Sequence, residues 1–481
     1  MKRVLTRTLI IVPGVVLLGA CGGGDKPTGP SYGPPTVSLL NGVTKATGLV
    51  GMTVVIEGNN FATPDQGAVY FTATDGTPIQ ATVNSSDWAN TYIVTTVPQG
   101  VANNSVVWVK TQAGTSDSLE FDLISGNTFS PSLISWKRTV DLPHPLQGLG
   151  AAFVPVEHGN FAKFIYTVGG AADSTNVATS VVYRAQVLET GAISAWDNSV
   201  TPLPSPRAYA ATAAATLYTA NIDTSTAGYL YAIGGVDSTG TVVNTVLYSR
   251  VAPDGSLGTW QSATALPAAV HSAAALVYRG YLYVIGGSDA QNKPTASAYR
   301  AQVKSDGSLG SWQPIASLAA PTAYHAVSNF GPYVYVVAGD TGTVGPATQT
   351  MSTTETGAAY LGKIDMRTGD VASWVPVTAA TKARAKHGVM SAGGSVVVTS
   401  GLYAGGTTGS SENSYAMISS DGTLGSWAGA TGSSTIASLL GYSIYNEAAV
   451  SFTDATGTGH VVVLGGANNS TGRASAGVVY Y

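Results

Sequence analysis

Residues 229–235, YLYAIGG, are one of six apolar runs that end in small residues and recur along the chain. The other five runs are FIYTVGG (164–170), YLYVIGG (281–287), YVYVVAG (333–339), SVVVTSG (395–401) and HVVVLGG (460–466). Short runs rich in aromatic and β-branched residues favour strands. Six copies of one strand pattern predict a protein built from repeated units.

A tryptophan follows each of the first five runs at a nearly constant distance. The spacing is 26, 25 and 25 residues after Gly170, Gly235 and Gly287, 26 after Gly401, and 35 after Gly339. One repeat therefore carries an insertion. The six tryptophans of this series are Trp136, Trp196, Trp260, Trp312, Trp374 and Trp427. A true repeat keeps its offsets as well as its composition, and this one does.

The ends of the repeat series predict how it closes. The last run ends at Gly466, and the chain reaches Tyr481 before another tryptophan occurs. Trp136, in contrast, precedes the first run and has no unit of its own. We therefore expect residues around 132 to 138 to supply the outer strand of the last unit, which would close a ring and remove its open edges.

Each unit also contains a hairpin pattern. The segment VLYSRVAPDGSLGTW (246–260) is typical of strand, tight turn and strand, and Asp-Gly favours a two-residue hairpin. Together with the Gly-Gly doublet, the downstream tyrosine and the spaced tryptophan, this pattern resembles the kelch repeat. The resemblance covers residues 130–481 and implies an all-β fold with a six-bladed β-propeller.

The N-terminus has the pattern of a secreted, lipid-anchored protein. Residues 1–21 carry a basic start and a short apolar stretch, which is typical of a signal peptide rather than a membrane span. The end of this segment, LGAC, resembles the bacterial lipobox, which implies acylation of Cys21 and attachment to a membrane in the cell envelope. Residues 22–34 are rich in Gly and Pro and predict a tether. Gly22 follows the cysteine, which favours the outer membrane if the cell is Gram-negative.

Residues 35–125 form a separate unit of alternating strands, about the size of an immunoglobulin-like sandwich. The matching motifs are Gly51–Gly58, Asn60 with Phe61, Val69 with Phe71, Val97 with Pro98, and Thr111 with Gly114. They resemble the IPT/TIG domain, an Ig-like fold that has no general catalytic site. The resemblance implies a spacer or a contact module.

Composition excludes several classes of function. Only 10% of the residues are charged, and the net charge is −4, so a nucleic-acid partner is not expected. The sequence contains no Walker loop, no HExxH motif and no GxSxG motif. Cys21 is the only cysteine, which rules out the copper site with a cysteine cross-linked to tyrosine that some kelch oxidases use. We expect no cofactor and no metal.

Polar residues recur where the inner strand of each repeat begins. Those chosen as ligand-binding candidates are His271, His325, His387, Arg384, Glu447 and Tyr209. Adjacent repeats supply them, so they should ring the mouth of the central channel and bind a sugar or a peptide side chain, with the imidazoles giving binding a pH dependence around pH 6 to 7. A three-histidine metal site is a further alternative. Equally, these side chains could bond backbone groups of neighbouring blades.

The loops predict which face binds. The inserted segment 340–359 and the candidate residues should emerge on one face, whereas the Asp-Gly hairpins, such as the one at Asp306, should emerge on the other. The sequence thus predicts an envelope binding module that recognises a glycan or a protein through its loops. Two alternatives are a carbohydrate-active enzyme, resembling a kelch-type sialic-acid mutarotase with Arg384 and Glu447 in acid–base roles, and an architectural protein.

Overall fold

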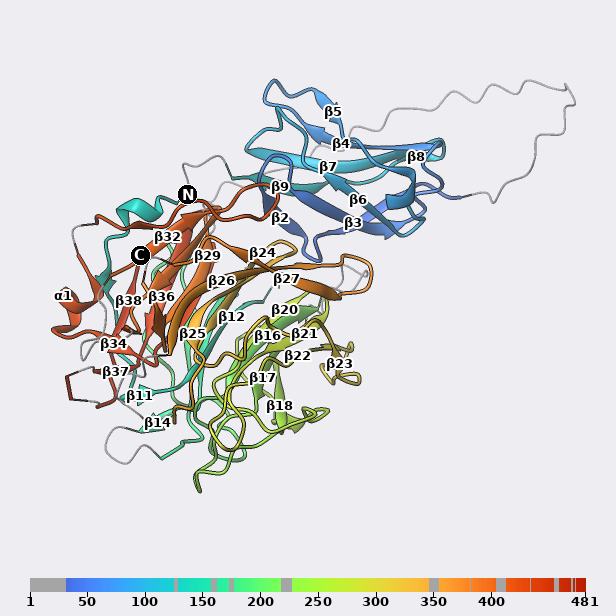
Figure 1. Cartoon of the computed structure of the whole chain (residues 1–481). Coiled ribbons are helices and arrows are strands. Elements are labelled where there is room, and N and C mark those ends of the chain that lie inside the picture. Colours follow the sequence, from blue (N-terminus) through green and yellow to red (C-terminus); the bar gives the residue numbers. More distant parts are fainter. Residues whose placement is uncertain are drawn as a thin grey trace, which may run out of the picture.

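The computed structural model describes residues 32–124, 129–156, 162–172, 177–217, 227–345, 354–380, 382–403, 412–432, 434–453, 458–468, 470–471 and 473–481 (Figure 1). Over these residues the fold is all-β, and the one α-helix is the short α1, Ile436–Leu440. Two units follow each other along the chain, an N-terminal unit (residues 36–123) and a C-terminal unit (residues 137–480).

The N-terminal unit consists of two sheets packed over one core. The first sheet has the order β1 (Thr36–Leu40), β3 (Thr53–Asn59), β6 (Tyr92–Thr96). The second has the order β2 (Lys45–Gly48), β9 (Leu119–Leu123), β7 (Asn104–Thr111), β4 (Gly67–Thr72), β5 (Pro78–Gln80), with β8 (Gly114–Thr115) paired to β7. Ile56 of the first sheet shares a buried cluster with Phe71 and Phe121 of the second. The parallel pairing of β2 with β9 was not anticipated from the sequence.

In the described residues, the C-terminal unit contains six sheets of three or four strands, which we number 1 to 6. Sheet 1 has β12 (Gly150–Val156), β13 (Ala162–Val168) and β15 (Val182–Val187); sheet 2 has β16 (Ala211–Leu217), β17 (Ala227–Ile233), β18 (Val246–Val251) and β19 (Gln261–Ser262); sheet 3 has β20 (Ala274–Tyr278), β21 (Tyr281–Ile285), β22 (Ala298–Gln302) and β23 (Gln313–Pro314). All are antiparallel and follow chain order. Each predicted apolar run is the second strand of its sheet.

Sheets 4 to 6 repeat this plan. Sheet 4 has β24 (Ala326–Phe330), β25 (Tyr333–Asp340), β26 (Glu355–Ile364) and β27 (Val371–Val377); sheet 5 has β29 (Gly388–Ala392), β30 (Ser395–Thr399), β32 (Ser414–Met417) and β33 (Ala428–Gly429); sheet 6 has β35 (Ala448–Thr453), β36 (Gly459–Leu464), β38 (Val478–Tyr480) and β10 (Lys137–Arg138). Two-stranded pairs flank them: β11 (Leu146–Gln147) with β14 (Ala171–Ala172), β28 (Arg384–Ala385) with β31 (Leu402–Tyr403), and β34 (Ile444–Tyr445) with β37 (Ala467–Asn468).

Sheet 6 joins the two ends of the C-terminal unit. Its outer strand β10 pairs with the C-terminal strand β38 through Lys137 opposite Tyr480 and Arg138 opposite Val479. Trp136, just ahead of β10, is only 1% exposed. The prediction that residues around 132 to 138 supply the last outer strand is therefore confirmed.

The first strands of the six sheets pack against one another in a closed cycle. β12 contacts β16, β16 contacts β20, β20 contacts β24, β24 contacts β29, β29 contacts β35, and β35 contacts β12. Small residues at the strand starts permit this approach: an added Cβ at Gly150 would lie 1.8 Å from the Thr212 hydroxyl of the next first strand. The first strands therefore surround a common axis.

Among the described residues, two sets of hydrogen bonds join neighbouring sheets at every boundary except the one between sheets 5 and 6. Second-strand tyrosines donate to a hairpin glycine carbonyl of the next sheet at 2.5 to 2.8 Å: Tyr166 to Gly255, Tyr231 to Gly307, Tyr283 to Gly369, and Tyr335 to Gly422. Tryptophan Nε1 atoms donate to carbonyls of the preceding sheet: Trp196 to Val140, Trp260 to Thr201, Trp312 to Thr264, Trp374 to Ala316, and Trp427 to Thr378. The repeated aromatic residues thus hold the sheets in register, besides filling the core.

The hairpin turns differ from the predicted two-residue type. In the turn after β18, the Ala252 N–H donates to the Ser256 carbonyl, and Gly255 alone has a positive φ, of 77°. The Asp254 carboxylate instead accepts bonds from the Ser256 N–H and hydroxyl. The longer turn is favoured because the Asp254 carboxylate accepts hydrogen bonds inside it. Only one of its residues is left-handed, whereas a type I′ turn needs two.

The N-terminal unit sits on the hairpin face of the C-terminal unit (Figure 1). Arg279, in the turn between β20 and β21, pairs with Glu57 of β3 at 2.9 Å. Met52 is buried against Phe330 and Tyr333 of sheet 4. The opposite face, where the first strands begin, lies away from these contacts.

Candidate functional site

Six backbone hydrogen bonds form a closed circle at the start of the first strands. Each bond joins residues that lie two positions ahead of a first strand, and each of these residues has a φ between 51° and 58°. In order, each N–H donates to the next carbonyl at 2.7 to 3.2 Å: Gly148 to Asn446, Asn446 to Lys386, Lys386 to Tyr324, Tyr324 to Ser272, Ser272 to Tyr209, and Tyr209 to Gly148. We call this circle the ring mouth.

The left-handed conformation is costly for most of these residues. It suits Gly148 and Asn446, but a bulky residue such as Tyr209 or Tyr324 rarely adopts it. Such strain persists only where the surroundings impose it, and it concentrates at functional sites. Here the hydrogen bonds of the ring mouth impose it at all six positions. Of these six residues, only Tyr209 is among the ligand-binding candidates selected from the sequence.

A cavity of about 130 Å³ opens at the ring mouth, with lining residues from all six sheets. The residue after each ring position decides its chemistry. Leu149, Ala210 and Ala273 make one half apolar, whereas His325, His387 and Glu447 make the other half polar. Because one water occupies about 30 Å³, the cavity has room for a small group and not for a whole macromolecular ligand.

The candidate residues divide into two groups. Tyr209, His325, His387 and Glu447 line the cavity, as the sequence analysis expected. His271 does not, because it lies one residue ahead of the ring position whereas the other two histidines lie one residue after it. Its Nε2 lies 3.1 Å from Asn292 Oδ1 and its Nδ1 lies 3.0 Å from Ser272 Oγ. The expected equivalence of the three histidines was therefore wrong.

Arg384 lies behind the cavity wall and is fully buried. Its guanidinium donates to the Ser400 carbonyl and to the Tyr403 hydroxyl, both at 3.2 Å, and stacks on the Tyr403 ring. Arg384 therefore bonds the backbone next to the second strand of its own sheet and not that of a neighbouring sheet.

The two cavity histidines are neutral rather than poised near pH 7. Burial lowers the pKa of His387 to about 3 and that of His325 to about 4. The Nε2 atom of His387 lies 3.1 Å from the Val337 carbonyl of the neighbouring sheet, so this nitrogen carries the proton. The expected pH dependence around pH 6 to 7 does not follow, because a buried imidazole resists charging.

Glu447 is protonated at neutral pH. Burial raises the pKa of this carboxyl to about 8, although the Gly388 N–H donates to Oε1 at 3.0 Å and opposes the shift. Within the described residues Oε2 has no hydrogen-bond partner, and neither has Nδ1 of His387. The polar half of the cavity thus presents a carboxylic acid beside neutral imidazoles. Oε2 of Glu447 and Nδ1 of His387 can each form a hydrogen bond with a ligand.

Lys386 is a cavity residue that the sequence analysis missed. Its ammonium lies 4.9 Å from the centre of the Tyr324 ring and 5.9 Å from that of Tyr445. Burial lowers the pKa of Lys386 to about 8, although the negative charges of Asp340 and Glu355 act to raise it. A lysine next to His387 gives no signal in the sequence, because the ring conformation that turns its side chain to the mouth is visible only in the structure.

A groove of about 380 Å³ adjoins the ring mouth and shares Tyr209 with it. Its walls come from the loops after the second strands of sheets 1 to 3: Val177, Val236, Asp237, Thr239, Val242 and Asn292. Of the inserted segment 340–359, positions 346–353 lie outside the described residues, as does Cys21.

Metal ligation and membrane crossing can be judged for the described part of the chain. There, no three His, Cys, Asp or Glu side chains are grouped closely enough to hold a metal ion. In the same residues, no helix has the length and apolar character needed to cross a bilayer.

Comparisons with known proteins give little further guidance. No family model and no curated protein matches the chain. Among solved structures, one titled "Structure of YjhT" is 14% identical, with a TM-score of 0.48, and the match covers 70% of this chain and 94% of that one. A likeness at this level carries no argument about function.

Glu447→Gln tests the state of the buried carboxyl. The folded protein holds this proton up to about pH 8, whereas an unfolded carboxyl releases it near pH 4.5. The wild type should therefore lose stability as the pH rises through this window, by up to about 1.4 kcal/mol per pH unit. Gln stays neutral, so the variant should lose less in urea unfolding between pH 5 and 8. Glu189→Gln, at an exposed hairpin position, is the control and should behave like the wild type.

Proposed function

We propose that this chain is a lipid-anchored protein of the cell envelope that binds the end of a glycan at the ring mouth. In this proposal the six sheets of the C-terminal unit form a six-bladed β-propeller of the kelch type, and the N-terminal unit is an Ig-like spacer of the IPT/TIG type. Acylation of Cys21 supplies the membrane anchor, on the outer membrane if the cell is Gram-negative.

The packing of the sheets supports the propeller. Six antiparallel sheets follow the same strand order, their first strands contact one another in a closed cycle, and β10 pairs with β38. The circle of six hydrogen bonds at the ring mouth adds an independent sixfold repeat. The two sheets packed over one core support the spacer.

The position of the N-terminal unit supports a ligand site on the ring-mouth face. The N-terminal unit covers the hairpin face through the contact of Arg279 with Glu57 and the packing of Met52. An anchor that precedes residue 32 would therefore hold the protein by its hairpin side. The ring mouth then points away from the membrane, where a ligand can reach it.

The observation that carries the proposal is the divided lining of the cavity. Leu149, Ala210 and Ala273 line one half of a space of about 130 Å³, and His325, His387 and Glu447 line the other half. A sugar presents apolar C–H groups and hydroxyls on the same small ring, so it can use both halves. The adjoining groove can take the next residue of a glycan chain, because the two share the wall formed by Tyr209.

Binding of a glycan array by the Cys21→Ser chain tests this function. For any glycan bound, His387→Ala should weaken the affinity at least tenfold, since it removes a cavity wall and a hydrogen-bonding group. Asp306→Ala, in a hairpin of sheet 3 on the other face, should leave affinity unchanged. Loss in the Asp306 variant alone would put the site on the wrong face, and equal binding by all three proteins would favour an architectural role.

A second function is favoured by one observation, the protonated Glu447 beside a neutral imidazole. A carboxylic acid and a base in one cavity suit proton transfer on a bound sugar, as in mutarotation. A polarimetric assay on a panel of reducing sugars separates the two functions. Catalysis that Glu447→Gln abolishes would favour the enzyme, whereas binding without conversion would favour the module.

A further inference from the structure

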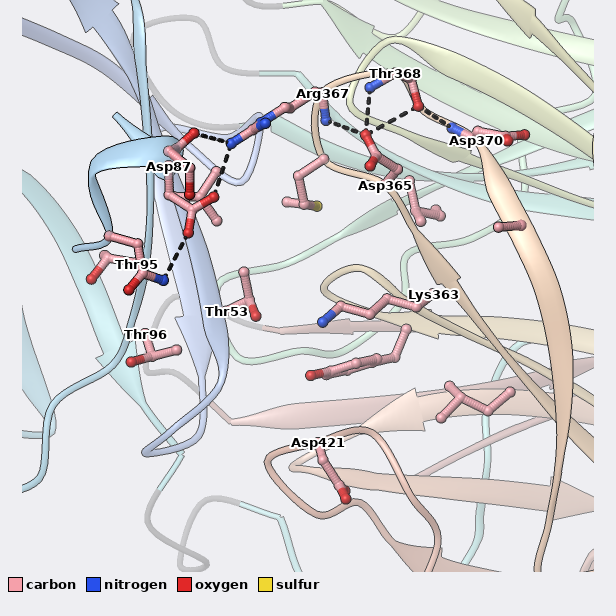
Figure 2. Close-up of a pocket in the computed structure, with 18 of the residues that line it drawn as sticks. Thr53, Asp87, Thr95, Thr96, Lys363, Asp365, Arg367, Thr368, Asp370 and Asp421 are labelled. Carbon is pink, nitrogen blue, oxygen red and sulfur yellow. Dashed lines mark hydrogen bonds and ion pairs between the residues drawn. The ribbon is translucent and has the colours of Figure 1, made fainter. Parts of the chain in front are cut away.

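A cleft of about 940 Å³ lies between the two units (Figure 2). It shares no lining residue with the cavity at the ring mouth. One wall is formed by β3, β6 and the segment 82–87 of the N-terminal unit. The other is formed by β26, β27 and their hairpin in sheet 4, and the hairpin of sheet 5 adds Asp421. Volumes of this size are typical of ligand sites, which occur preferentially where domains meet.

Sheet 4 has longer outer strands than its neighbours, and this difference forms the cleft. The outer strands β19, β23 and β33 have two residues each, whereas β27 has seven and its partner β26 has ten. The long hairpin carries Arg367 to the N-terminal unit, where it pairs with Asp87 at 2.9 Å and lies 5.7 Å from the Tyr92 ring centre (Figure 2).

A second set of contacts fixes the two walls relative to each other. Arg279 donates to Glu57 of the N-terminal unit and to the Met366 carbonyl of the long hairpin, so one guanidinium joins both walls. The side chain of Met52 packs against Tyr333 at the base of the cleft. Because the walls are held before a ligand arrives, binding would cost little ordering of the protein.

The lining mixes hydroxyls and amides with apolar surface. The hydrogen-bonding side chains include Thr53, Thr82, Asn84, Ser86, Thr96 and Ser373, and the apolar ones include Val94, Leu361, Met366 and Val375. Val375 is 53% exposed, which leaves apolar surface open to a ligand. This mixture suits a ligand whose units each carry hydroxyls and a C–H face.

The charges of the cleft exclude anionic ligands. Apart from the pair of Arg367 with Asp87, the lining carries Asp365, Asp370 and Asp421 against Lys363 alone. A hydrogen bond from the Thr423 hydroxyl lowers the pKa of Asp421, so it is ionised at neutral pH. The Lys363 ammonium projects into the cleft, 5.8 Å from the Tyr333 ring centre, and can donate to hydroxyl oxygens (Figure 2).

We propose that this interdomain cleft is a second binding site, for an uncharged oligosaccharide. The site is separate from the ring mouth and does not depend on it. Its volume of about 940 Å³, lined from both β6 and β27, suits a chain of several sugar units rather than a single residue. Lys363 of β26 and Thr96 of β6 donate to hydroxyls, and Val94 and Val375 contact the C–H faces.

The test uses the whole chain with Cys21→Ser and four uncharged hexasaccharides, those of glucose in α and in β linkage, of xylose and of mannose. Calorimetry should show that at least one binds. Thr96→Trp, at an exposed position that fills the cleft, and Lys363→Ala should each lower its affinity at least tenfold. His387→Ala at the ring mouth and Asp306→Ala outside the cleft should leave it unchanged. A hexamer of galacturonic acid, which is anionic, should bind at least tenfold more weakly.

The proposal would be overturned by failure of all four hexasaccharides to bind, by unchanged affinity in Thr96→Trp, or by tighter binding of the acidic hexamer. Loss of binding in His387→Ala alone would assign the glycan to the ring mouth, which would contradict the cleft and leave the first function intact. Loss in the cleft variants alone is the expected result, and it supports the cleft without contradicting a separate glycan site at the ring mouth. Thermal unfolding of each variant separates loss of a contact from loss of the fold.

Discussion

Replacing Trp136 by alanine should lower the free energy of unfolding by about 3 to 5 kcal/mol. The indole is 1% exposed and packs with Ile134, Val463 and Val479, so its removal leaves a cavity where the two ends of the C-terminal unit meet. Urea unfolding of the Cys21→Ser chain measures the change. Trp312→Ala is the matched control, and its cost should be smaller because Trp312 is partly exposed at an internal sheet.

Deleting residues 130–138 should lower the free energy of unfolding by more than Trp136→Ala does. The deletion removes β10 and leaves β38 as an unpaired edge, which promotes aggregation. If Trp136→Ala unfolded at the wild-type urea concentration, or if the deletion stayed monomeric and equally stable, the N-terminal strand would not be part of sheet 6.

Gly169→Ala should destabilise the protein by roughly 2 to 5 kcal/mol. Gly169 has a φ of 59°, and an added Cβ would lie 2.1 Å from the Arg207 carbonyl oxygen. The left-handed conformation costs an alanine roughly 1 to 2 kcal/mol, and the overlap with backbone adds about 1 to 3 kcal/mol. Urea unfolding again gives the change in free energy.

Ala338→Gly at the equivalent position of sheet 4 is the control for this prediction. Ala338 already adopts a φ of 57° with its methyl group buried. The gain from relieved strain and the loss of buried surface and chain entropy should nearly cancel, within about 1 kcal/mol. Equal effects of the two substitutions would mean that the glycine doublets do not mark close backbone approach.

Much of the C-terminal unit could be predicted from its sequence because its signals repeat. The six apolar runs are all second strands, and the unmatched Trp136 correctly located β10. In the N-terminal unit the strands β3, β4, β6 and β7 carry clear apolar alternation and were expected. The strand β2, KATG, has almost no apolar content, and β1 and β9 follow turns without a strong pattern, so their pairings come from tertiary packing.

The candidate site was predicted in part for the same reason. Spacing placed Tyr209, His325, His387 and Glu447 at the mouth, because their positions relative to the apolar runs repeat. Spacing could not show that His271 lies one residue, and Arg384 two residues, ahead of the ring position of its sheet. Neither side chain therefore lines the cavity. Nor could spacing predict how strongly burial shifts the imidazole pKa values, since desolvation depends on the neighbouring sheets.

The interdomain cleft could not have been found from the sequence. It depends on the contact of Arg367 with Asp87, two residues that lie 280 positions apart. The inserted segment after Gly339 indicated that sheet 4 differs from its neighbours. It did not indicate that the longer strands β26 and β27 carry the hairpin to the N-terminal unit.

Closure of the ring by β10 is the central claim, and one disulfide tests it most directly. Lys137 and Tyr480 face each other across β10 and β38, within the reach of a disulfide, although they are 343 positions apart in the sequence. In the Cys21→Ser chain, which has no other cysteine, Lys137→Cys and Tyr480→Cys should form an intramolecular disulfide on mild oxidation. Peptide mapping by mass spectrometry should recover the linked peptides in nearly all molecules. Free thiols at both positions in the folded, oxidised protein would contradict the closed ring.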